Sequence, residues 1–405
     1  MKVRTRRDGR AWQAVADDCE GVTGDTIARL LKLTALNPAL TLPLFLLGKY
    51  SVDGSRIAAA HATAWKHLKT LLVLGLADRV SHWLDDAVTN NWVNDTYVWS
   101  REVVVVTGGS DGIGKIVVQL LAEKGIKVAV LDVQEPTYRG THTYSFDIES
   151  YANCGPAPPS VHYFHCDLTS PSSISSTASQ IQRTLGSPTI LINNAGVARG
   201  KTILDTTEKD IELTFKVNTF AHYHLTQAFL PHMVATNHGM IVTVASLAGY
   251  VTAPSMVDYA ASKAAAIAFH EGLSAELITQ YKAPKVRTVL MCQGYTRTKL
   301  FEGFGGKALW PETVAEAIVE AVLGGRSRHV LLPEVSGGFV SWLRGMPLWY
   351  QYAVRKRLEG LMSGWRGRQV VQPSEKKEEE KKKMEEGKEE KDKGVEGSTV
   401  MVDGE

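Results

Sequence analysis

Between residues 101 and 333, short runs rich in valine, isoleucine and leucine alternate with segments of helical length, and this alternation constrains the fold more than any other feature. The runs read REVVVVTGG, KVAVLDV, TILINNAG, GMIVTVAS, KVRTVLM and HVLLPE. Strands that alternate with helices form a parallel sheet that helices cover on both faces. We therefore predict an α/β fold with a doubly wound parallel sheet, whose ligands bind beyond the carboxyl ends of the strands.

The chain of 405 residues is longer than this one domain requires. We divide it into a helical N-terminal region (1–100), the sheet domain (101–333), a segment rich in aromatic and basic residues (334–372) and a charged tail (373–405). The tail contains SEKKEEEKKKMEEGKEEKDK and has no apolar periodicity, so we predict that it is disordered.

A glycine-rich turn, TGGSDGIG, follows the first strand and leads into a helical pattern. Glycines at such a turn let the backbone approach a diphosphate, for which the helix N-terminus supplies free N–H groups and a positive dipole end. Three glycines alone also suit an ordinary turn, but here the strand and the helix both fit a Rossmann-type dinucleotide site. The candidate cofactor residues of this turn are Gly108, Ser110, Asp111, Gly112, Ile113 and Gly114.

The second run ends at Asp132, whose carboxylate can accept hydrogen bonds from the adenosine ribose and would repel a 2′-phosphate. The glycine-rich turn also carries Ser110 and Asp111 where a basic residue could stand. Both features favour NAD over NADP as the cofactor, although Asp132 is also compatible with a plain strand end.

Polar or small residues follow the next two strands. Asp167, beside Leu168 in FHCDLT, can hydrogen-bond adenine or cap the helix that follows. Asn194, Ala195 and Gly196 in INNAG leave room for a cofactor or form a turn. All five residues are candidates for cofactor binding.

Tyr259 and Lys263 lie four residues apart in VDYAASKAAAIAF, which places both on one face of a helix. A tyrosine is a poor base at neutral pH, but an ammonium about 4 Å away would lower its pKa by about three units at an effective dielectric near 20. Tyr259 would then serve as a general acid or base. The same spacing is common on solvated helix faces, so it needs support from other residues.

Two further polar residues give that support. Ser246 ends the run GMIVTVAS, where its hydroxyl can polarise a substrate carbonyl or cap the strand. Asn218 lies in the helical pattern of FKVNTF, where asparagine is unfavourable unless it has a local polar role, such as holding a water beside Lys263. The candidate catalytic residues are Asn218, Ser246, Tyr259 and Lys263.

Taken together, TGGSDGIG, NNAG and these four residues resemble the short-chain dehydrogenase/reductase family in order and spacing, across about residues 101–330. The resemblance implies a nicotinamide cofactor and Tyr259 as the proton-transfer residue. It also implies that Lys263 binds the nicotinamide ribose and that Ser246 orients the substrate. Gly294, Thr296 and Thr298, after the sixth strand, would contact the cofactor.

Two departures from the family pattern stand out. The usual proline-glycine pair after the sixth strand reads Gln293-Gly294 in MCQGYTRT, which loosens the turn but removes no reactive group, so we expect activity to survive. The connection from Gln134 to Ser160 is long for the family, and loops of this length are usually either functional or disordered.

The apolar stretch LNPALTLPLFLLG, Leu36–Gly48, raises the question of a membrane. A membrane-spanning helix needs about 20 mostly apolar residues. This run is shorter, and Pro38 and Pro43 interrupt it. We therefore predict a hairpin or interfacial segment in preference to a straight span or a buried core segment.

An amphipathic pattern runs from Ile57 to Val88, and FVSWLRGMPLWYQYAVRKRLEGL near the other end combines aromatic and basic residues. This composition suits a membrane interface and also a homodimer contact. The NPxLxLPL pattern resembles the membrane-associated retinol and hydroxysteroid dehydrogenase subgroup, including its lipid-droplet members. That resemblance implies a lipophilic alcohol or carbonyl substrate, such as a retinoid, a steroid or a long-chain lipid. The location would be the endoplasmic reticulum membrane or a lipid droplet, with the catalytic domain facing the cytosol.

Other partners are less consistent with the sequence. The net charge of +2 gives no reason to expect nucleic acid. The four cysteines show no metal-ligand spacing, and His222 and His224 point in different directions on a helix, so we expect no metal. Two alternative functions stay open: a soluble carbonyl reductase that uses NADPH, and a non-catalytic scaffold at membranes or lipid droplets that binds the cofactor.

Overall fold

The computed structural model describes residues 24–136 and 160–368. The predicted disorder of the tail 373–405 therefore concerns residues outside the described ranges, as does most of the Gln134–Ser160 connection.

Seven parallel strands form one sheet in the order β3-β2-β1-β4-β5-β6-β7. The chain starts in the middle of this sheet, builds outward to β3, returns beside β1 with β4, and builds outward again to β7. This topology confirms the predicted doubly wound α/β fold. The strands are β1 (Val103–Thr107), β2 (Lys127–Asp132), β3 (Val161–His165), β4 (Ile190–Asn193), β5 (Gly239–Val244), β6 (Val286–Gln293) and β7 (Arg328–Leu332).

Helices cover both faces of the sheet. On one face, α6 (Gly112–Glu123) and α11 (Pro311–Leu323) share a core with Val104 and Val106. On the other face, Val105 joins the core formed with α7 (Pro171–Leu185), α9 (Ala221–Thr236) and α10 (Val257–Thr279). Because successive strand residues point to opposite faces, a strand covered on both sides needs the uninterrupted valine run seen in β1.

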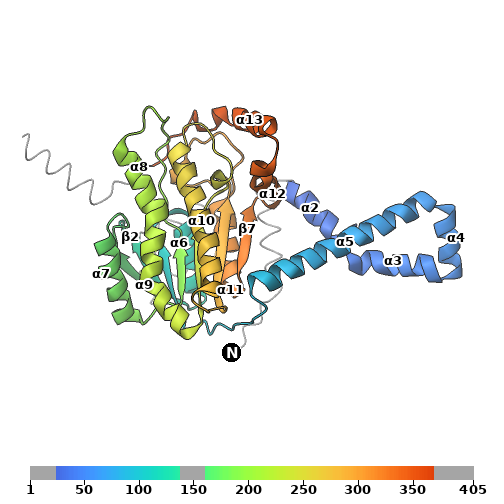
Figure 1. Ribbon diagram of the computed structural model, residues 1–405, viewed down its shortest axis with the longest axis horizontal. Coiled ribbons are helices and arrows are strands. Elements are labelled where there is room, and N and C mark those ends of the chain that lie inside the picture. The colour runs from blue at the N-terminus through green and yellow to red at the C-terminus, as the bar shows by residue number, and fades with distance from the viewer. Residues whose placement is uncertain (1–23, 137–159, 369–405) are drawn as a thin grey trace, which may run out of the picture.

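Four helices precede the sheet domain, and all but the first, which lies against α12 (Glu334–Trp342), extend away from its body (Figure 1). They are α2 (Gly24–Leu33), α3 (Pro38–Tyr50), α4 (Val52–Ala60) and α5 (Ala62–Thr89). We call α3–α5 the N-terminal hairpin, since α3 folds back along α5 and Phe45 stacks on Trp65 with ring centres 5.2 Å apart.

The apolar stretch itself is helical despite its two prolines. Asn37 caps α3 by accepting a hydrogen bond from the Ala39 N–H, and Pro38 occupies the first turn, where its missing N–H is not needed. Pro43 lies inside the helix. Within the described part of the chain, no single helix is long and apolar enough to cross a membrane. The pair α2 and α3, bent by 42°, meets those criteria of length and composition together.

The C-terminal segment forms α12 (Glu334–Trp342) and α13 (Leu348–Arg357), followed by the short 3-10 helix η6 (Glu359–Met362). The Asp25 carboxylate of α2 accepts hydrogen bonds from the backbone N–H groups of Glu334 and Val335 at 2.7 and 2.8 Å. These bonds fasten the start of the described chain to α12, because they cap the exposed N-terminus of that helix.

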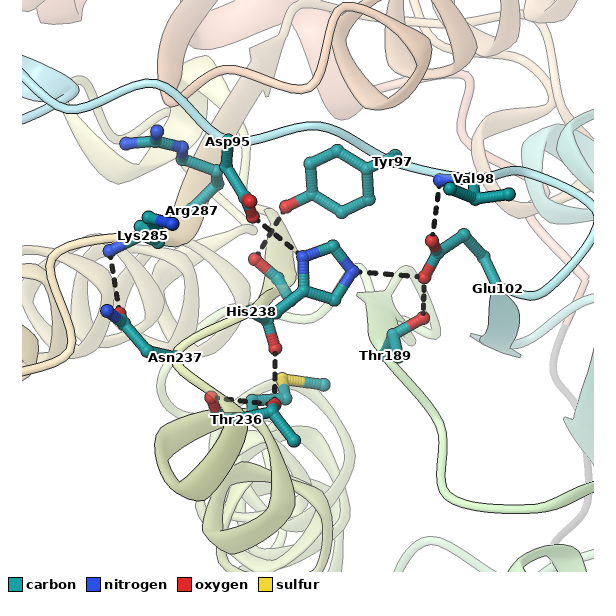
Figure 2. A network of polar contacts seen from close by, with 12 residues as sticks. Asp95, Tyr97, Val98, Glu102, Thr189, Thr236, Asn237, His238, Lys285 and Arg287 are labelled. Atoms are coloured by element: carbon teal, nitrogen blue, oxygen red, sulfur yellow. Dashed lines mark hydrogen bonds and ion pairs between the residues drawn. The ribbon is translucent and has the colours of Figure 1, made fainter. Parts of the chain in front are cut away.

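The linker from α5 to β1 (residues 90–102) runs beneath the amino ends of the strands, where a polar network holds it (Figure 2). His238 lies between Asp95 and Glu102, with ring nitrogens 2.7 and 3.3 Å from the two carboxylates. Tyr97 donates a hydrogen bond to the Gly239 carbonyl at 2.7 Å. The linker is therefore part of the folded body.

Candidate active site

A cavity of about 430 Å³ lies at the carboxyl ends of the strands, between the glycine-rich turn and α10. Most of the residues proposed from the sequence line it. They are Gly108, Asp111, Gly112, Ile113, Asp132, Leu168, Asn194, Ala195, Gly196, Ser246, Tyr259, Lys263, Gly294, Thr296 and Thr298. Four others lie behind its wall: Ser110, Gly114, Asp167 and Asn218.

The glycine-rich turn is shaped by close backbone contacts. Gly108 has a φ of +65°, and a Cβ atom there would lie 2.9 Å from the Ala195 Cα. At Gly114 a Cβ atom would lie 2.2 Å from the Gly108 carbonyl oxygen, so this glycine packs the turn against its helix. The turn thus brings the amino end of α6 to the cavity, as a site for the diphosphate of a dinucleotide requires, and the Asp111 carboxylate caps that end.

Asp132 ends β2 at the cavity wall. Its two carboxylate oxygens accept hydrogen bonds from the backbone N–H groups of Ser110 and Gln134, each at 3.0 Å. Burial raises the pKa of Asp132, and these N–H donors oppose that rise. Because a carboxylate can accept about four hydrogen bonds, Asp132 can still accept from a ribose hydroxyl.

Asp167 does not face the cavity. Its Oδ1 accepts hydrogen bonds from the N–H and the hydroxyl of Thr169, at 2.9 and 2.7 Å. These bonds close a turn, and the following helix α7 is capped by Ser170 rather than by Asp167. The adjacent Leu168 lines the cavity, and a contact between Asp167 and adenine stays a prediction.

Ser246 and Tyr259 lie together at one end of the cavity. The Ser246 hydroxyl donates to the Gln293 carbonyl at 3.3 Å and accepts from the Ala248 N–H at 3.1 Å. A hydrogen bond also joins Ser246 and the Tyr259 hydroxyl. Gln293, which stands where the family has proline, thus supplies a carbonyl that orients Ser246.

The expected lowering of the Tyr259 pKa by Lys263 is absent from this structure. Burial raises the pKa of Tyr259 to about 12, and the Ser246 hydrogen bond only partly opposes it. Lys263 donates instead to the Val244 carbonyl at 2.8 Å, and its Nζ lies 5.8 Å from the centre of the Tyr259 ring. Burial lowers the pKa of Lys263 to about 8.

Asn218 lies in a π-helical turn, Lys216–Phe220, a form often found at functional sites. Its Oδ1 accepts from the Val197 N–H at 2.8 Å, and its Nδ2 donates to the Val197 carbonyl at 2.9 Å and to the Ser262 hydroxyl at 3.0 Å. The amide therefore fixes the loop after β4, and a water held beside Lys263 stays a prediction.

Sequence reasoning missed the apolar wall beside Tyr259. Its residues come from the loop after β6 and from the segment after α13, neither of which carries a periodic pattern. They include Leu300, Phe301, Phe304, Leu358 and Leu361, joined at the cofactor end by Arg368. An apolar cluster in TKLFEGFGG, just after the sixth strand, was the available signal.

The described residues contain no group of three or more His, Cys, Asp or Glu side chains placed to hold a metal ion. A doubly wound sheet, a glycine-rich turn and a serine and tyrosine at one cavity define a dinucleotide-dependent oxidoreductase.

Comparison with known proteins makes this more specific. Residues 102–307 match the family described as short chain dehydrogenase. Dehydrogenase RED2 of Cochliobolus heterostrophus is 44% identical over 223 residues, which cover 55% of this chain and 78% of that protein. Human estradiol 17-beta-dehydrogenase 11 is 34% identical over 225 residues, which cover 55% of this chain and 72% of that protein. Mouse epidermal retinol dehydrogenase 2 is 32% identical over 228 residues, which cover 55% of this chain and 71% of that protein.

Among solved structures, a short chain dehydrogenase/reductase from Burkholderia phymatum in complex with NAD shares the fold. Its TM-score is 0.52 at 22% identity, with 62% of this chain and 95% of that chain covered. The chain belongs to the short-chain dehydrogenase family and is an NAD(P)-dependent alcohol dehydrogenase/reductase.

Proposed function

We propose that this enzyme interconverts a lipophilic alcohol and its carbonyl compound, of the retinoid, steroid or long-chain lipid class, with NAD preferred over NADP. The observation that carries the proposal is the apolar wall beside Tyr259, where Phe301 meets the tyrosine ring edge-on at 5.4 Å. An apolar wall favours an apolar substrate, because burying its surface removes it from water. The names of the estradiol and retinol dehydrogenase relatives are consistent with this class.

Tyr259 is the proposed proton-transfer residue. With its pKa raised to about 12, its hydroxyl carries the proton that a carbonyl oxygen gains on reduction. The Ser246 hydroxyl would donate a second hydrogen bond to the same substrate oxygen by turning its single hydrogen away from the Gln293 carbonyl, which accepts it at 3.3 Å in this structure. A bound nicotinamide supplies or accepts the hydride.

The remaining candidate residues would hold the cofactor. The glycine-rich turn and the amino end of α6 suit the diphosphate, and Lys263 suits the nicotinamide ribose. The Asp132 carboxylate at the cavity wall supports NAD, since it would repel a 2′-phosphate.

We further propose that the protein attaches to the endoplasmic reticulum membrane or a lipid droplet. The N-terminal hairpin exposes large apolar side chains on α3 and α5, including Leu40, Leu44, Val73 and Leu74. The C-terminal helices expose Phe339, Trp342 and Trp349 beside a basic run at the end of α13. Both compositions suit a lipid interface.

A substrate panel tests the function. Retinol, hydroxysteroids, long-chain alcohols and short water-soluble alcohols are each offered with NAD and with NADP, and turnover is followed by absorbance of the reduced nicotinamide. We expect the highest kcat/KM for a lipophilic alcohol with NAD. Turnover confined to short alcohols, or to NADPH-dependent carbonyl reduction, would contradict the proposal.

A further inference from the structure

Residues 358–368 form a strap across the cavity. The strap lies along residues 298–306, the loop that follows β6, although the two segments are far apart in sequence. Four hydrogen bonds join them: Gly305 N to Leu361 O (2.8 Å), Arg366 N to Glu302 O (2.7 Å), Arg368 N to Lys299 O (2.7 Å) and Trp365 Nε1 to Leu300 O (3.0 Å). These two paired segments, called the lid below, together line one side of the cavity.

Glycines at two positions permit this pairing. Gly303 has a φ of +79°, and a Cβ atom there would lie 1.9 Å from the Gly364 carbonyl oxygen. Gly200 has a φ of +63°, and a Cβ atom there would lie 2.2 Å from the Trp365 ring. Any larger residue would push the strap away. The strap therefore packs at a defined position against the body of the enzyme.

Arg368, at the end of the strap, places a positive charge at the cavity. The Arg368 guanidinium lies 3.1 Å from an Asp111 carboxylate oxygen and donates to the Gln134 side-chain oxygen at 2.7 Å. Lys299, from the partner segment of the lid, lies 3.3 Å from the same Asp111 oxygen. Asp111 is the N-cap of α6, so a carboxylate stands where a diphosphate would bind, and two cations offset its charge.

We propose that Arg368 binds a phosphate of the cofactor and so fastens the strap when the dinucleotide is present. This step rests on the nicotinamide cofactor of the family and does not depend on the substrate class or on the preference for NAD. A guanidinium has five N–H donors in a planar fork that suits a phosphate. Arg368 lines the cavity, so the donors left over from Asp111 and Gln134 can reach a bound dinucleotide.

The strap connects the two ends of the site. Leu358 and Leu361 of the same segment line the substrate end of the cavity. Because linkage is reciprocal, a cofactor that stabilises the closed strap also completes the apolar wall for the substrate. Bound cofactor should then strengthen the binding of the lipophilic substrate, and bound substrate that of the cofactor, by the same factor.

Cofactor binding to the full chain tests the role of Arg368. Dissociation constants for NADH and NADPH are measured by quenching of tryptophan fluorescence, without substrate. Arg368→Ala should weaken binding about tenfold, the size expected for a hydrogen bond to a charged group. The matched control is Arg366→Ala, an exposed arginine of the same strap outside the cavity lining, which should change either constant less than twofold.

The relative loss of affinity for NADH and for NADPH identifies which phosphate of the cofactor Arg368 contacts. An equal loss for NADH and NADPH assigns the contact to the diphosphate, and a larger loss for NADPH assigns it to the 2′-phosphate. Unchanged dissociation constants for both cofactors overturn the proposal.

Hydrogen exchange of residues 358–368 gives a second readout: NADH should protect them in the wild type and not in Arg368→Ala. Equal exchange with and without NADH in the wild type also contradicts it. Because every readout is binding, failure of the proposed substrate class leaves these results unaffected.

Discussion

At the scale of single residues, Tyr259 is the side chain on which the proposed chemistry depends. Tyr259→Phe removes the hydroxyl and keeps the ring contact with Phe301, so turnover should fall between about 100-fold and 10,000-fold, the usual contribution of a general acid or base. The dissociation constant for NADH should stay within about twofold, since the ring still fills its place. The control is Tyr250→Phe, whose hydroxyl contacts His329 outside the cavity lining. Retained turnover in Tyr259→Phe would remove Tyr259 from the mechanism.

Two buried histidines make stability depend on pH. Burial lowers the pKa of His222 to about 3 and that of His270 to about 4. In the unfolded chain both take a proton near pH 6.5, so the unfolded state binds more protons as the pH falls below that value. The free energy of unfolding should therefore decrease as pH falls from 6.5 towards 4, by up to about 1.4 kcal/mol per pH unit for each histidine.

Urea unfolding at pH 7, 6 and 5 measures this dependence. In His222→Asn the titrating group is gone, so the free energy should fall less steeply with acid than in the wild type. All carboxylates remain in both proteins, so the difference in slope reports His222 alone. Parallel pH profiles would show that His222 takes up its proton in the folded state.

At the scale of elements, the sequence predicted those strands and turns whose structure depends on neighbouring residues in the chain. The six strand-like runs and the glycine-rich turn are short, and each was located from its own residues. The strap and the linker contacts were not predictable, because Arg368 meets Asp111 across 257 positions and Arg287 meets Asn90 across 197. The pKa of Tyr259 was misjudged for a similar reason, since Lys263 bonds to β5 rather than approaching the ring. Pro43 was taken to break a segment that is helical around it.

The linker between the N-terminal hairpin and β1 supplies an element-scale prediction (Figure 2). The fully buried Arg287 donates to the carbonyls of Asn90, Val93 and Pro284. Arg287→Met leaves these buried acceptors without a donor, so the free energy of unfolding should fall by about 2–4 kcal/mol. Urea unfolding measures the loss, and limited proteolysis should show new cleavage within residues 90–99.

A neighbouring arginine provides the matched control. Arg326 pairs with Asp86 at the surface, where exposed ion pairs contribute little. Arg326→Met should therefore cost less than about 1 kcal/mol. If both variants unfold at the same urea concentration, Arg287 does not hold the linker.

At the scale of the whole molecule, apolar surface is concentrated outside the body that contains the sheet. The N-terminal hairpin extends away from that body (Figure 1), and its α3 helix is apolar on nearly every side. The strap that lines the cavity follows directly from α13, whose last turn carries Arg355, Lys356 and Arg357. A surface proposed to touch lipid is therefore continuous in sequence with the lid beside the cavity. This arrangement suits a substrate that arrives from a lipid phase.

Vesicle flotation tests the membrane proposal on the full chain. Leu44 and Val73 are 57% and 63% exposed on α3 and α5, and Leu44→Asp with Val73→Asp places charges where lipid contact is proposed. Each apolar side chain that leaves the interface costs about 1.5 kcal/mol or more, so partition onto phosphatidylcholine vesicles should fall about 100-fold. The matched control is Leu204→Asp, at the most exposed leucine of the sheet domain (96%), which should float like the wild type.

Charge reversal of Arg355 and Arg357 should weaken binding only when the vesicles contain phosphatidylserine, because neutral lipid offers no charge to attract them. If the double variant floats as well as the wild type, the hairpin does not hold this enzyme at a membrane, and its exposed leucines require another partner.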